Sequence, residues 1–171
     1  ALFGDEKLLT GGSGLLESWA RYLKEKQDRL HETKTGGERQ LILAGSCSAM
    51  TLAQIDRYQQ QGGISLKLDP QALLDGNQSV PSLWQSVLEY ERPVLLYSSD
   101  VPERVKMHQS WGAETVSRVL EQTMASLARR AVDAGFGAVI VAGGETSGAV
   151  VKELQYDAYE IGASVAPGVP V

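Results

Sequence analysis

The chain has 171 residues, of which 43% are hydrophobic, and a formal net charge of −5 at pH 7. This size and composition are typical of one globular domain, or of one domain with part of another. The negative charge argues against a nucleic-acid partner, because affinity for a phosphate backbone comes from clustered Lys and Arg. No apolar run reaches the roughly 20 residues that span a bilayer, and the amino end has no secretory pattern. We therefore expect a cytoplasmic protein with neither a membrane nor a nucleic acid as partner.

The first 33 residues predict a strand, a glycine loop and a helix, and the segment "HETKTGGERQ" that begins at His31 has no apolar periodicity. We interpret residues 1–33 as the end of an amino-terminal domain and residues 34–40 as a linker. The chain stops at "PGVPV", which reads as the start of another strand. We therefore expect residues 41–171 to form a second domain that is truncated at its carboxyl end.

Strands and helices alternate regularly along this second domain. A short helix is expected to open at Asp69, as N-cap, and Pro70. Alternation at these lengths predicts an α/β fold with three layers, in which helices cover both faces of a doubly wound, mostly parallel sheet. The expected strands are 41–45, 64–68, 93–99 and 138–144, and the longer helices are 49–61, 82–91, 113–134 and 146–154.

Three segments run from an apolar strand through glycine and small hydroxyl residues into a helix: "KLLTGGSG", "LILAGSCSAMT" and "VIVAGGETSG". In open α/β sheets such loops gather at the carboxyl ends of the strands, where ligands bind. Helix amino ends present unpaired N–H groups that suit phosphate, and glycine lets the anion approach the backbone. The residues predicted to form this phosphate cradle are Gly143, Gly144, Thr146 and Ser147, with Gly45, Ser46 and Ser48 across the crevice.

A structural alternative for the last of these loops is a tight turn in which Thr146 or Ser147 acts only as an N-cap. The sequence contains neither G-x-x-x-x-G-K-[ST] nor a G-x-G-x-x-G that opens a helix after a strand. It therefore supports neither a P-loop NTPase nor an ordinary dinucleotide-binding fold.

Other chemically capable residues have weaker patterns. Glu145 would reach Mg2+ through water or bond a ribose, or it is simply an acidic residue of a first helical turn. Cys47 as a nucleophile, His108 as an acid or base and Asp100 as a crevice residue each compete with an ordinary role in packing, at the surface or in a turn. One cysteine and two histidines leave no internal disulfide and no zinc-type cluster. The sequence therefore assigns no catalytic residue and no protein metal site.

The motifs "LILAGSCSAMT", "VIVAGGETSGAVVKEL" and "YEIGASVAPGVPV" resemble the carboxyl-terminal nucleotide-binding domain of the four-carbon acid sugar kinases, which include 3-oxo-tetronate and erythronate-type kinases. The resemblance implies an ATP- and Mg2+-dependent kinase acting on the terminal hydroxyl of a four-carbon sugar acid in bacterial carbohydrate catabolism. It places ATP contacts at Ser46, Ser48, Gly143, Gly144, Glu145 and Thr146.

The resemblance also implies that the sugar acid binds the amino-terminal domain of the same polypeptide, of which residues 1–33 are the end. Family members use a further glycine segment beyond "PGVP", so this chain alone is expected to be inactive. A homodimer, and the identity of the sugar acid, stay open. Two other classes also stay open: a non-catalytic module that binds a small anion or a nucleotide, and a dinucleotide- or sulfonium-cofactor enzyme, against which the missing fingerprint argues.

Overall fold

The computed structural model divides the chain into two compact units. The larger unit is Thr35–Tyr159, and the smaller combines Ala1–Lys34 with Glu160–Val171. The structure describes residues 39–45, 48–98, 112–159, 164–166 and 169–170.

Within the smaller unit, the described residues form a two-stranded antiparallel sheet of β5 (Ser164–Ala166) and β6 (Val169–Pro170). The strand, loop and helix predicted in the first 33 residues lie outside the described residues. The predicted linker at 34–40 and the domain assignments on either side of it therefore stay predictions.

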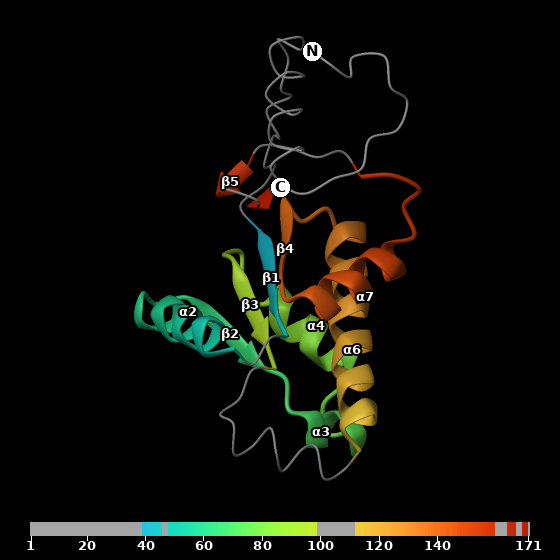
Figure 1. Ribbon diagram of the computed structural model, residues 1–171. Helices are drawn as coiled ribbons and strands as arrows, with labels where there is room; N and C mark the ends of the chain where they lie inside the picture. Colours follow the sequence, from blue (N-terminus) through green and yellow to red (C-terminus); the bar gives the residue numbers. More distant parts are fainter. Residues whose placement is uncertain (1–38, 46–47, 99–111, 160–163, 167–168, 171) are drawn as a thin grey trace. The chain divides into compact units, whose positions relative to one another are not determined.

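The larger unit is built on a four-stranded sheet in the order β2-β3-β1-β4 (Figure 1). Every neighbouring pair is parallel, and β1 lies between β3 and β4. In this register Leu41 of β1 stands beside Val94 of β3 and Val139 of β4. The strands are β1 (Gln40–Ala44), β2 (Ile64–Lys67), β3 (Val94–Tyr97) and β4 (Ala138–Ala142).

Helices cover both faces of this sheet (Figure 1). Side chains alternate along a strand, so Leu41 and Leu43 join the core beneath most of the helices, whereas Ala44 packs with Ile55 of α2 on the opposite face. The predicted three-layer, doubly wound α/β fold is thus confirmed. The helices are α2 (Ala49–Gln60) on one face and α3 (Pro70–Leu74), α4 (Val80–Leu88), α6 (Ala113–Asp133) and α7 (Gly144–Leu154) on the other.

Helix starts follow local hydrogen bonding. Asp69 caps α3 as predicted, and its carboxylate accepts from the N–H groups of Gln71 at 2.9 Å and Ala72 at 3.2 Å. The predicted helix 82–91 instead begins at Val80, because Ser79 and Ser82 bond each other reciprocally in a capping box.

The helices that follow the strands lie on different faces of the sheet, and the change of face occurs at β1. The chain leaves β1 through α2 on one face, whereas it enters helices on the opposite face after both neighbours, α6 after β3 and α7 after β4. In α/β sheets, ligands generally bind outside the carboxyl ends of the strands at such a reversal. Among the described helices, none is both long enough and apolar enough to cross a membrane.

Candidate functional site

The pairing of β1 with β4 brings two of the predicted glycine loops together. Ala44 and Ala142 are partners in the register, so Gly45 and Gly143 follow them side by side at the carboxyl edge. The Gly45 N–H donates to the Ala142 carbonyl at 3.3 Å, which extends the ladder by one bond. Two segments almost one hundred residues apart in sequence therefore meet at the predicted position.

Thr146 fills the space behind Gly45. Its residue surface is only 4% exposed, although it lies in the first turn of a helix. A Cβ built on Gly45 would overlap the Thr146 Oγ1 and lie 3.4 Å from the Thr146 Cβ. Among the described residues, none forms a hydrogen bond with the Thr146 hydroxyl, which is unusual for so buried a polar group.

The amino end of α7 has no side-chain cap. Its N-cap residue is Gly143, with φ 121° and ψ 133°, a conformation that L side chains rarely adopt. The alternative in which Thr146 or Ser147 is the N-cap is therefore wrong, and the helix starts two residues before the predicted 146. Among the described residues no side chain caps the first N–H groups of α7, and these groups carry the positive end of the helix dipole. Beside them Gly144 is exposed, and a Cβ added there would meet nothing within 4 Å.

The amino end of α2 differs, because Ser48 caps it. The Ser48 Oγ accepts from the Thr51 N–H at 3.1 Å and lies 2.9 Å from the Thr51 Oγ1. Ser48 is thus exposed but engaged in holding its own helix. Ser46, which the sequence placed in the cradle beside it, lies outside the described residues, as do Cys47, Asp100 and His108.

One residue of this edge was missed by sequence reasoning. Ser98 follows β3 directly, is 8% exposed, and donates its N–H to the Ala44 carbonyl at 3.1 Å, next to Gly45. The signal was present, since "PVLLYSS" also ends an apolar strand on small hydroxyls, but it lacks the glycine of the other loops.

Glu145 lies in the first turn of α7 and is exposed. Within the described part of the chain, no three His, Cys, Asp or Glu residues stand close enough to hold a metal ion.

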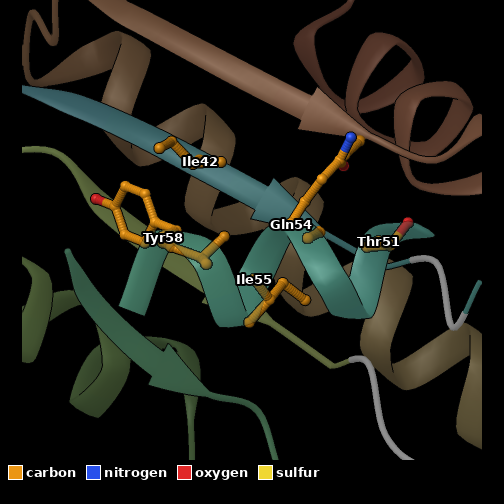
Figure 2. Close-up of a pocket in the computed structure, with 8 residues that line it drawn as sticks. Ile42, Thr51, Gln54, Ile55 and Tyr58 are labelled. Atoms are coloured by element: carbon orange, nitrogen blue, oxygen red, sulfur yellow. The ribbon is translucent and has the colours of Figure 1, made fainter. Parts of the chain in front are cut away.

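A pocket of about 180 Å³ lies between α2 and the sheet (Figure 2). Figure 2 shows Ile42 on the strand and Ile55 and Tyr58 on the helix, and all three line the pocket. The Tyr58 hydroxyl donates to the Pro93 carbonyl at 2.9 Å, and burial raises the pKa of this phenol. Ala44, Thr51, Gln54, Leu95 and Ala142 complete the lining.

A parallel α/β sheet with an uncapped, glycine-rich helix start at its carboxyl edge defines a class of domain that binds phosphate-bearing ligands. Residues 41–171 match the family described as "Nucleotide-binding C-terminal domain", and the chain belongs to this family.

The relatives agree with the resemblance seen in the sequence. The chain is 38% identical to a 3-oxo-tetronate kinase from Pseudomonas fluorescens, over 99% of this chain and 41% of the relative. It is 34% identical to a 3-oxo-tetronate kinase from Pectobacterium atrosepticum, over 97% of this chain and 42% of the relative. A crystal structure of a Haemophilus influenzae protein matches with a TM-score of 0.84 and 32% identity, over 98% of this chain and 42% of that one. The assignment to the four-carbon acid sugar kinase group is thereby confirmed, and the chain spans about two fifths of the length of these relatives.

Proposed function

We propose that this chain is the ATP-binding part of a kinase that phosphorylates the terminal hydroxyl of a four-carbon sugar acid, such as 3-oxo-tetronate or erythronate. The observation that carries the proposal is the amino end of α7, which has no side-chain cap, starts on Gly143 and has open space at Gly144. The names of the related kinases support the reaction class.

The residues present fit the phosphates of ATP. The first N–H groups of α7 point out of the helix end, where a phosphate can accept from them, and the helix dipole favours negative charge there. The buried Thr146 hydroxyl, with no hydrogen-bond partner among the described residues, provides a further donor at the same edge. Gly45 and Ser48, together with Ser46 as predicted from the sequence, complete the proposed site, in which Ser48 also keeps α2 in place.

Bound Mg-ATP supplies the transferable phosphoryl group and a cation that offsets its charge. Here the backbone of Gly143 and Gly144 holds and orients the phosphates, and Glu145 would hold Mg2+ through water. The sugar acid would bind the rest of the polypeptide, which includes residues 1–33 and is joined through 34–40. For this reason we expect the chain alone to bind ATP without turnover, in a cytoplasmic protein whose subunit number is open.

Calorimetric titration of the chain with ATP and Mg2+ tests the proposal. Gly144→Asp places a carboxylate where the phosphates would sit and should abolish binding. Gly148→Asp is the matched control, because Gly148 lies one turn along the same helix and also has open space around it. Thr146→Val removes the hydroxyl at nearly constant volume and should weaken binding by about 1 kcal/mol or more.

The outcomes separate the alternatives. If neither the chain nor the complete polypeptide binds ATP, the phosphate-cradle proposal is wrong, and binding of NAD instead would support the dinucleotide class. If the complete polypeptide binds ATP but does not consume it with any four-carbon sugar acid, the site belongs to a non-catalytic nucleotide-binding module.

A further inference from the structure

The turn that follows α3 contains the sequence Asp75-Gly76, and no other aspartate of the chain precedes a glycine. An Asp-Gly bond is chemically reactive, because no side chain of the glycine shields its amide nitrogen from the carboxyl carbon of the aspartate. Both residues are exposed in the structure. Water can therefore reach this bond, and the turn is a candidate for covalent modification.

The backbone at Gly76 restrains such a reaction only weakly. Gly76 has φ 75°, and a Cβ built on it would meet nothing within 4 Å. Its N–H donates to the Leu73 carbonyl at 3.4 Å, which is longer than most protein hydrogen bonds. Because α3 ends at Leu74, with Asp75 as its C-cap, the attack requires the loss of this long bond rather than the unfolding of a helix.

The Asp75 carboxylate is held by one neighbour on α3. The Gln71 Nε2 donates to both of its oxygens at 2.8 Å, from a position one helical turn earlier. An exposed amide and carboxylate with this spacing contribute only about 0.2–0.5 kcal/mol. Gln71 therefore slows the attack on the carboxyl carbon without preventing it.

We propose that Asp75 is a site of spontaneous isomerisation to isoaspartate in the folded chain. The Gly76 nitrogen bonds to the Asp75 carboxyl carbon, and the nitrogen proton and the carboxyl hydroxyl leave as one water, which closes a succinimide ring. Water then adds back and opens the ring, so no oxidant, metal or nucleotide is consumed. Opening at the α-carbonyl leaves the backbone running through the Asp75 side chain, with a free α-carboxylate that an isoaspartate-specific methyltransferase can recognise.

Isoaspartate adds one methylene to the backbone of a turn that hydrogen bonds close. The Gln78 N–H donates to the Ala72 carbonyl at 2.9 Å, across the turn. The Gln78 side chain also ties the turn to the end of β2, because its Nε2 donates to the Lys67 carbonyl at 3.1 Å and its Oε1 accepts from the Asp69 N–H at 3.0 Å. The added methylene lies between Ala72 and Gln78, so isomerisation should loosen this connection.

The test ages the folded chain and a urea-unfolded sample side by side at physiological temperature. Electron-transfer fragmentation of the digested chain locates isoaspartate, and methylation by an isoaspartate-specific methyltransferase measures its amount. Asp133 is the internal control, because it is exposed at the end of α6 but precedes an alanine. Asp75→Glu is the matched variant, since glutamate at this position cannot form the five-membered ring.

We expect isoaspartate to form at Asp75 of the folded chain at a rate within about tenfold of the unfolded chain, equivalent to about 1.4 kcal/mol. Asp133 and the Asp75→Glu variant should stay unmodified. Gln71→Leu should speed the reaction by about twofold in the folded chain, the equivalent of one such pair, and leave the rate in urea unchanged. Isoaspartate at Asp75 in urea but not in the folded chain would overturn the proposal, because the fold would then shield the bond.

Amide hydrogen exchange measures the consequence for the turn. In the aged chain the Gln78 amide should exchange about fivefold faster than in the fresh chain, the equivalent of one ordinary hydrogen bond lost. The Asp75→Glu variant, aged in the same way, should keep its original exchange rate. Unchanged exchange at Gln78 in a chain that contains isoaspartate would contradict the loosening of the turn.

Discussion

The hydroxyl of Thr146 occupies the space in which any residue other than glycine at position 45 would place its Cβ. The two residues come from loops after different strands, so this contact fixes how closely the start of α7 approaches the end of β1. The geometry of the proposed phosphate site therefore depends on the packing of one small residue against another.

Gly45→Ala is expected to destabilise the fold by about 1–3 kcal/mol, because the added methyl overlaps a buried neighbour. Thr146→Ala removes that neighbour's hydroxyl, so the double variant should recover part of the loss. Urea unfolding of the two single variants and the double variant measures the coupling. Additive effects would show that the two residues do not constrain each other.

Two other glycines allow the effect of a positive φ on stability to be measured apart from the effect of steric overlap. A Cβ added at Gly62 or at Gly148 meets nothing within 4 Å, but only Gly62 has a positive φ, of 76°. Gly148→Ala should stabilise α7 by about 0.5–1 kcal/mol through helix propensity, and Gly62→Ala should destabilise by about 1 kcal/mol through strain. Thermal unfolding of both variants checks this, and changes of the same sign would contradict it.

Gln155 ends α7 in the left-handed conformation, with φ 52°. Glycine adopts this conformation without steric cost, so Gln155→Gly should raise the free energy of unfolding by about 0.5–1 kcal/mol. Gln155→Val should lower it, because a β-branched residue is most strained there. If urea unfolding showed the Gln155→Val variant to be more stable than the Gln155→Gly variant, the prediction would be wrong, because the backbone at this position would then have left the left-handed conformation.

The ion pair of Arg39 and Glu91 predicts a pH-dependent contribution to stability. The Arg39 guanidinium donates from Nε to the Glu91 Oε2 at 2.7 Å and from Nη2 to the Glu91 Oε1. These hydrogen bonds lower the pKa of Glu91. The folded state therefore holds the carboxylate charged more strongly than the unfolded state does. The contribution is complete above the unfolded pKa of about 4.3, and it is lost as the pH falls through the lowered folded pKa.

Glu91→Gln should accordingly cost a small amount of stability at pH 7 and nothing at the acid end of the transition, since both partners are exposed to solvent. Unfolding of the two proteins from pH 7 down to about pH 3 measures the difference between them. Glu89→Gln is the control on the same segment, where the described residues show no ion pair. A difference that grew in acid would reverse the sign of the argument.

The sheet could be predicted from sequence because its strands are apolar on both sides. "LILAG", "PVLLYSS" and "AVIVAGG" each contain more consecutive apolar residues than a solvent-facing strand needs. Burial on both faces explains that excess for β1 and β3, whereas Ile140 of β4 is exposed. The predicted starts of the helices were less accurate, because local capping interactions decide where a helix begins. The Ser79 and Ser82 box and the uncapped Gly143 start each moved a helix by two residues.

The candidate site was predictable where glycine marks it. Gly45, Gly143 and Gly144 follow β1 and β4, and these strands prove to be parallel neighbours whose carboxyl ends lie at one edge. The sequence itself did not give the order of the strands. The pocket was not predictable, since Ile42, Gln54 and Tyr58 look like ordinary core and surface residues in sequence. They define a cavity only because α2 crosses the face of β1 at a particular position, and no local pattern encodes that position.

The position of β4 at the end of the sheet has a practical consequence for the isolated chain. Among the described strands β4 has a neighbour on one side only, and Ile140 at its centre is 47% exposed. An unpaired edge with an apolar side chain beside it is a template for pairing with another copy. Purified samples should therefore associate as concentration rises, and a lysine at this position, Ile140→Lys, should keep them dispersed without touching the proposed ligand contacts.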